Sequence, residues 1–381
     1  MSRKRLIIFF FVMISVLICG CLGEGNIVTA DMRGGEISAA SVDLPKPNPI
    51  DEALRSMTLE EKIGQMMMVG FYGTELNDDI KYLLSTFHFG GVIFFDRNLL
   101  DVAQAKKLSD DIQTFAGQKY PLLIALDEEG GRVARGRDFL PPAPSQEEVG
   151  ISGDTSAATY WARYNAQLLR SVGVNINFAP VADVGSRDTR SFGDDAQTVA
   201  EFVEAAAQGY ESENFLYTLK HFPGIGRSKI DPHKAVSSVE VGRDVLEAED
   251  FLPFRKIISG HDDSKFMIMV GHLKYDALDA ENSASLSRAV MTKLLRGDMG
   301  FDGVVVTDDL EMGAIKNNVE LSTLGVKTIL AGGDIALVCH NYESQQIVYD
   351  GILSAVRRGE ISESRIDESV RRILKLKSHL N

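Results

Sequence analysis

The sequence predicts an α/β protein with the fold of a single (β/α)8 TIM barrel, and three observations support that fold class. Short apolar runs of strand length recur eight times, and most are apolar throughout, as buried parallel strands are. Amphipathic stretches long enough for a helix separate these runs. The spacing G-x-G-x-x-G, typical of many members of the alternative class of doubly wound sheets, opens none of the expected helices.

The elements follow in order from a helix start at Thr58-Leu59-Glu60-Glu61, a capping box in which side chains bond the first free N–H groups of a helix. The expected strands are Gln65–Phe71, Gly91–Phe95, Leu122–Leu126, Val174–Phe178, Tyr217–Leu219, Phe266–Val270, Gly303–Val306 and Ile335–Val338. Expected helices include Leu100–Phe115, Ala157–Ser171, Ala196–Asn214, Ser287–Met299, Glu343–Arg358 and a final helix at Ser364–Leu380. These units use the whole of residues 50–381, so we expect one domain there.

The N-terminal segment differs from the rest of the chain. Three basic residues precede the apolar run Leu6–Ile18, which has the layout of a secretory signal and is shorter than the ~20 residues of a membrane-spanning helix. The run leads into a sequence that resembles a lipobox, so we expect residues 1–21 to be a lipoprotein signal peptide and Cys21 to carry the lipid anchor. The alternative is an uncleaved signal anchor. Both interpretations place the protein at the membrane outside the cytoplasm, in the cell envelope, with residues 22–49 as a flexible tether.

The composition limits the possible partners. The chain has 54 acidic and 40 basic residues, a net charge of −14 and no basic block, whereas nucleic-acid phosphates require clustered Lys and Arg. We therefore expect no nucleic-acid partner. Neither H-E-x-x-H nor another metal-ligand spacing occurs, so we expect no metal and no cofactor.

Polar side chains follow the expected strands at their carboxyl ends, where a barrel of this type places its active site. After the third strand come Asp127, Glu128 and Glu129, after the fourth Asp183, Arg187 and Arg190, and after the fifth Lys220 and His221. His272 follows the sixth strand, Asp308 and Asp309 follow the seventh, and His340 and Asn341 follow the eighth. Carboxylates mixed with Lys, Arg and His suit the hydroxyls and amide of a neutral sugar. Glycoside hydrolysis commonly needs two ionisable groups beside the anomeric carbon.

Two segments resemble the β-N-acetylhexosaminidase branch of glycoside hydrolase family 3. The run from Lys220 to Gly226 (KHFPGIG), followed by Asp231-Pro232-His233, is similar to the branch's K-H-F-P-G-x-G and D-x-H motifs. Residues 303–312 (GVVVTDDLEM) are similar to the strand that carries the family's nucleophile. Weaker matches extend the resemblance over about residues 57–377. The sequence departs from the pattern at Ile225, where the branch usually has His, at Arg227-Ser228, and at Val236-Ser237.

The resemblance implies a catalytic set in which Asp308 is the nucleophile, His233 the general acid/base and Asp231 its partner. It also implies that the terminal sugar is bound by Asp127, Arg135, Arg190, Lys220 and His221. The implied activity is that of a retaining exo-β-N-acetylglucosaminidase, which hydrolyses terminal β-linked GlcNAc of a glycan through a covalent glycosyl-enzyme.

Other functions stay open at this point. A β-glucosidase-like exo-glycosidase of the same family is one, although such enzymes usually carry a second domain. A GlcNAc phosphorylase is another, because an imidazole acid/base lacks the negative charge that would repel phosphate. The altered residues around Ile225 also permit a catalytically inactive, sugar-binding surface lipoprotein.

Overall fold

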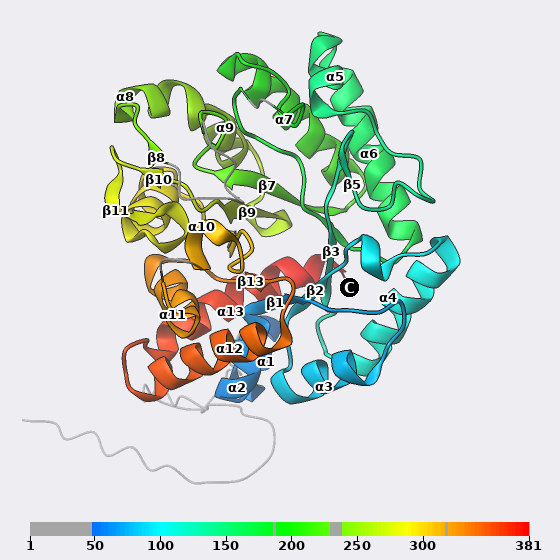
Figure 1. Ribbon diagram of the computed structural model, residues 1–381, viewed down its shortest axis with the longest axis vertical. Coiled ribbons are helices and arrows are strands. Elements are labelled where there is room, and N and C mark those ends of the chain that lie inside the picture. The colour runs from blue at the N-terminus through cyan, green and yellow to red at the C-terminus, as the bar shows by residue number, and fades with distance from the viewer. Residues whose placement is uncertain (1–47, 186–187, 229–237, 317–318, 381) are drawn as a thin grey trace, which may run out of the picture. The chain divides into compact units, whose positions relative to one another are not determined.

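The computed structural model describes residues 48–185, 188–228, 238–316 and 319–380 (Figure 1). From Pro49 onward they form one compact unit around a sheet of eight parallel strands. The strands are β1 (Met67–Gly70), β2 (Gly91–Ile93), β3 (Leu123–Leu126), β6 (Ile176–Asn177), β7 (Leu216–Phe222), β9 (Phe266–Val270), β12 (Val304–Thr307) and β13 (Ala336–Val338). Each overlaps one expected run, so all eight expected strands are confirmed, and every residue in them is buried.

The strands pair in chain order, and β13 pairs back to β1. A parallel bridge joins Val306 of β12 to Ile335, directly before β13, and the Thr307 N–H donates to the Ile335 carbonyl at 3.1 Å. The eight strands therefore form a ring, which leaves no open sheet edge. The predicted (β/α)8 barrel is confirmed.

Helices surround the strands (Figure 1). The main ones are α2 (Leu59–Gln65), α3 (Asp78–Phe87), α4 (Val102–Ala116), α6 (Thr155–Ser171), α7 (Ala196–Ser212), α9 (Leu252–Gly260), α11 (Leu321–Ala331), α12 (Tyr342–Arg357) and α13 (Glu363–Lys377). The capping box is confirmed, since Thr58 Oγ1 accepts from the Glu61 N–H at 3.2 Å and Glu61 Oε2 accepts from the Thr58 N–H at 2.8 Å. The segment expected as a helix at Ser287–Met299 is a π-helix, η5 (Ala289–Asp298).

The barrel carries additional short strands and helices that the sequence did not predict. A hairpin of β4 (Glu128–Gly130) and β5 (Val133–Ala134) follows β3, and a small sheet joins β8 (Ser238–Val239), β10 (Lys274–Tyr275) and β11 (Asp279–Ser283). The remaining helices are α1 (Pro49–Ser56), α5 (Gln146–Ile151), α8 (Arg243–Val245), α10 (Gly313–Lys316), η1 (Asp96–Asn98), η2 (Leu246–Asp250), η3 (Asp263–Lys265), η4 (Ala284–Leu286) and η6 (Ser378–Leu380). In the described part of the chain no helix is long and apolar enough to span a membrane.

Four predicted features fall outside the described residues. These are the signal peptide with Cys21, nearly all of the expected tether, Arg187 after the fourth strand, and the Asp231 and His233 pair. The placement of Lys220 and His221 was wrong in detail, because both lie within β7 rather than after it.

Candidate active site

A cavity of about 1260 Å³ opens at the carboxyl ends of the strands. Its lining includes Asp308 and all five residues expected to bind a sugar, which are Asp127, Arg135, Arg190, Lys220 and His221. These side chains come from segments between residues 127 and 308, so the barrel brings together groups that are far apart in the sequence. Its volume is somewhat above the usual range for small-molecule sites, roughly 300–1000 Å³.

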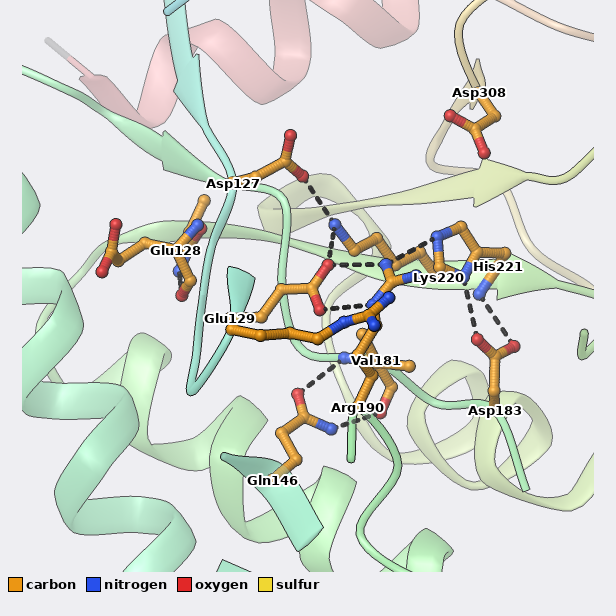
Figure 2. A network of polar contacts seen from close by, with 12 residues as sticks. Asp127, Glu128, Glu129, Gln146, Val181, Asp183, Arg190, Lys220, His221 and Asp308 are labelled. Atoms are coloured by element: carbon orange, nitrogen blue, oxygen red, sulfur yellow. Dashed lines mark hydrogen bonds and ion pairs between the residues drawn. The ribbon is translucent and has the colours of Figure 1, made fainter. Parts of the chain in front are cut away.

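Lys220 is the centre of an ion network on the cavity wall (Figure 2). Its ammonium lies 2.7 Å from Asp127 Oδ1 and 2.6 Å from Glu129 Oε1, and its side chain is only 2% exposed. Burial lowers the pKa of Lys220, but the two carboxylates outweigh burial and raise the pKa above its ordinary value. Lys220 is therefore a permanent cation in the wall.

Glu129 links Lys220 to Arg190. The Arg190 guanidinium donates twice to the Glu129 carboxylate, at 2.8 and 2.7 Å, which is the strong bidentate geometry of this pair. Burial opposes ionisation of Glu129, yet the charges and hydrogen bonds of Lys220 and Arg190 hold its pKa well below the usual range. The sequence prediction placed Glu129 at the mouth of the barrel but assigned it no role, and the structure shows it to be the counter-ion of both cations.

Glu128 was expected at the mouth with its two neighbours, and that placement was wrong. Figure 2 shows its side chain directed away from Asp127 and Glu129, because successive side chains of an extended chain point to opposite sides. Glu128 is fully buried and accepts from the Gly136 N–H at 3.2 Å. Burial raises its pKa to about 7.

His221 occupies the neighbouring part of the wall. Its Nδ1 lies 2.8 Å from Asp183 Oδ2, and its Nε2 lies 3.3 Å from Arg190 Nη2. Asp183 also lines the cavity and is almost fully buried. The prediction placed Asp183 at the mouth without a function, because nothing in the local pattern identifies its partner 38 residues later.

Arg135 lies in another part of the same cavity. Its guanidinium is 5.5 Å from the centre of the Phe95 ring, and its Nη1 is 3.7 Å from Asp96 Oδ2. Its buried Nε has no hydrogen-bond partner among the described residues. Arg135 therefore keeps an unused donor, although it stands apart from the Lys220 network.

Asp308 and Asp309 follow β12 and have opposite electrostatic environments. Burial raises the pKa of Asp308, but the Asp309 N–H (2.8 Å), the Lys220 ammonium and, at the acidic pH where an aspartate titrates, the imidazolium charges of His221 and His272 lower it below the ordinary value. Burial, Glu311 and Asp308 instead raise the pKa of Asp309 to about 7. Asp308 is the carboxylate of the pair that is ready to act as an anion at neutral pH.

The two later histidines at this end of the barrel have different surroundings. His340 lines the cavity, with its Nε2 3.4 Å from Asp309 Oδ2. His272 is buried behind the wall, with Nδ1 2.7 Å from Ser285 Oγ and Nε2 2.9 Å from the Asp309 carbonyl. His272 thus supports the backbone next to Asp308 and does not line the cavity described here.

Comparisons with known proteins identify the family of this chain. The family model described as "Glycosyl hydrolase family 3 N terminal domain" matches residues 58–376. "Beta-hexosaminidase LpqI" of Mycobacterium tuberculosis is 32% identical over 95% of each chain, and "Beta-hexosaminidase A" of Pseudoalteromonas piscicida is 32% identical over 81% of this chain. The present chain spans 56% of the second protein's length. A family 3 β-N-acetylglucosaminidase structure from Paenibacillus sp. is 39% identical with a TM-score of 0.82, covering 85% of this chain and 63% of that one.

Proposed function

The chain belongs to glycosyl hydrolase family 3, and on this premise we propose that it is a retaining exo-β-N-acetylglucosaminidase that removes terminal β-linked GlcNAc. One observation carries the proposal. A single cavity joins an ionised carboxylate, Asp308, to a network of cations and carboxylates that can bind sugar hydroxyls. Such a site supplies a nucleophile and a binding surface for one terminal sugar.

The network suits an uncharged sugar. Lys220 and Arg190 carry two positive charges, and Asp127 and Glu129 carry two negative charges, so these four groups sum to zero. An ammonium has three N–H donors, and Asp127 and Glu129 occupy two of the Lys220 donors. The third donor and the other carboxylate oxygen of Asp127 can bond hydroxyl groups of the substrate.

The reaction follows from the position of Asp308. Its carboxylate attacks the anomeric carbon, the glycosidic C–O bond breaks, and the leaving oxygen takes a proton from the general acid. Water then attacks the same carbon, gives its proton to the group that had acted as acid, and releases Asp308. Two inversions at one carbon retain the configuration. We propose His233, supported by Asp231, as the acid/base, from the sequence resemblance alone.

The substrate and the acid/base can be tested together. The purified protein is expected to release nitrophenol from an aryl β-GlcNAc much faster than from an aryl β-glucoside. Because a positioned acid/base contributes roughly 10²–10⁴-fold, His233→Ala is expected to lower this rate by about that factor, while His379→Ala, in η6, leaves the rate near wild type. Rates are measured with and without phosphate.

Each competing function gives a different result in that assay. Faster turnover of the glucoside would favour a β-glucosidase, and phosphate-dependent formation of a sugar 1-phosphate would favour a phosphorylase. Sugar binding without any turnover would favour an inactive sugar-binding protein. An unchanged rate in His233→Ala would contradict the assignment of the acid/base.

We also propose that the protein is anchored to the cell envelope by a lipid on Cys21. The support is the basic segment, the short apolar run and the lipobox-like sequence before this cysteine. In a bacterial host, mass spectrometry is expected to find a mature chain that begins at a lipid-modified Cys21. The Cys21→Ala variant should keep its precursor mass. A wild-type chain that also keeps the unprocessed mass would indicate a signal anchor instead.

A further inference from the structure

Asp183 stands behind His221 and bonds it in two places. The Asp183 side chain is only 3% exposed. Its Oδ1 accepts from the backbone N–H groups of His221 at 3.1 Å and Ile225 at 2.9 Å, and its Oδ2 lies 2.8 Å from His221 Nδ1 (Figure 2). The carboxylate thus holds the His221 backbone, the His221 ring and the start of the segment after β7.

The partners of His221 determine where its ring proton lies. An ionised carboxylate can only accept hydrogen bonds, so Nδ1 carries a hydrogen that it donates to Asp183. A guanidinium can only donate, so Nε2, at 3.3 Å from Arg190 Nη2, must offer its lone pair. A proton on Nε2 would place two N–H donors against each other. The hydrogen-bond network therefore assigns His221 as a neutral imidazole protonated on Nδ1.

We propose that Asp183 is a positioning residue for the reaction. It locks His221 in the neutral Nδ1-protonated form, so that Nε2 presents an acceptor to a hydroxyl of the bound sugar. The Arg190 contact to Nε2 is longer than the 2.7 Å bond from the same Nη2 to Glu129, so a substrate hydroxyl can replace it without breaking the ion network. The role of Nε2 toward a sugar rests on the proposed glycosidase function. The assignment of the tautomer does not depend on that function.

This assignment gives the cavity wall a directed pattern of donors and acceptors. Lys220 and Arg190 are donors only, Asp127 and Glu129 are acceptors only, and His221 adds one further acceptor next to the Arg190 donor. A sugar hydroxyl both donates and accepts, so it can bond His221 Nε2 and a neighbouring cation at once. A protonated His221 could not accept such a hydrogen bond.

Asp183→Asn is the variant that separates this role from simple packing. The two backbone N–H groups require an acceptor, so the amide oxygen is expected to stay with them and the amide NH2 to face His221 Nδ1. Nδ1 must then accept, and the ring proton moves to Nε2, against Arg190. Since a wrong tautomer disables an imidazole in a catalytic site, kcat/KM for aryl β-GlcNAc is expected to fall by about 10²-fold or more.

A double-mutant cycle provides the matched control. If Asp183 acts through His221, Asp183→Asn should cause little further loss of kcat/KM once His221→Ala has been introduced. An equal loss in both backgrounds would indicate a purely structural role and overturn the proposal. A change of less than threefold in the single variant would overturn it as well.

NMR of protein labelled with ¹⁵N in its histidines tests the tautomer without any substrate. The His221 signals, identified by their loss in His221→Gln, should show a protonated Nδ1 and an unprotonated Nε2 at neutral pH in the wild type. The two nitrogens should exchange these states in Asp183→Asn. A wild-type ring protonated on Nε2 would refute the inference even if the variant fails to fold. An inactive wild-type enzyme with the expected tautomer would refute only the proposed function.

Discussion

Asp308→Asn is expected to lower kcat for aryl β-GlcNAc by about 10³-fold or more while the protein stays folded. The substitution removes the negative charge that attacks the anomeric carbon in the proposed mechanism, and loss of a nucleophile removes the whole covalent route. The wild-type Asp308 carboxylate is buried, yet its pKa lies below the ordinary value, so it is ionised at neutral pH. Steady-state rates give the size of the loss. A slowly reacting fluorinated glycoside should add its glycosyl mass to the wild type and not to the variant.

Asp309→Asn is the matched control for this prediction. Asp309 is the next residue and is also mostly buried, but its pKa is raised to about 7. Its Oδ1 accepts from the N–H groups of Glu311 and Cys339, both at 3.1 Å, and an amide oxygen can accept the same bonds. The variant should therefore keep most of its activity. If Asp309→Asn is inactive and Asp308→Asn is active, the nucleophile has been assigned to the wrong residue.

Lys220→Met is expected to have the second large effect, on stability and on activity. The ammonium is the partner of Asp127 and Glu129, and its loss leaves a buried carboxylate network with too little positive charge. Removing one member of a buried ion pair costs about 3–5 kcal/mol of unfolding free energy. The loss of a charged donor at the sugar should lower kcat/KM by a further factor of about 10² or more. Urea unfolding and steady-state rates measure the two effects.

Lys62→Met is the control for Lys220→Met, because it removes the cation of an ordinary, partly exposed ion pair. The Lys62 ammonium pairs with Asp367 at the same distance, 2.7 Å, but Asp367 is 35% exposed and the pair lies outside the cavity. Partly exposed pairs contribute about 0–1 kcal/mol, so this variant should unfold close to the wild type and keep its rate. Equal urea midpoints for wild type and Lys220→Met would show that the buried network adds little to stability.

The barrel was predictable because local sequence carries its signal. Each of the eight barrel strands overlaps a short, mostly apolar run and is buried throughout, and amphipathic stretches separate these runs. Polar residues at the strand ends then had to meet at one mouth, which is why Asp127, Arg190, Lys220 and Asp308 were expected together and do line one cavity. The unexpected extra strands have two to five residues and are too short to leave a clear pattern.

The sequence by itself determined the fold class, the mouth of the barrel as the candidate site, and most of the ionisable side chains in the cavity wall. Only the tertiary structure decided which of two adjacent carboxylates faces the cavity, with Glu129 turned toward Lys220 and Glu128 turned away. It also decided that Asp183 is the partner of His221. The physical reason is that periodicity records burial along one segment, whereas charge state and hydrogen-bond partners depend on groups from other strands. Those groups meet only when the ring of strands closes.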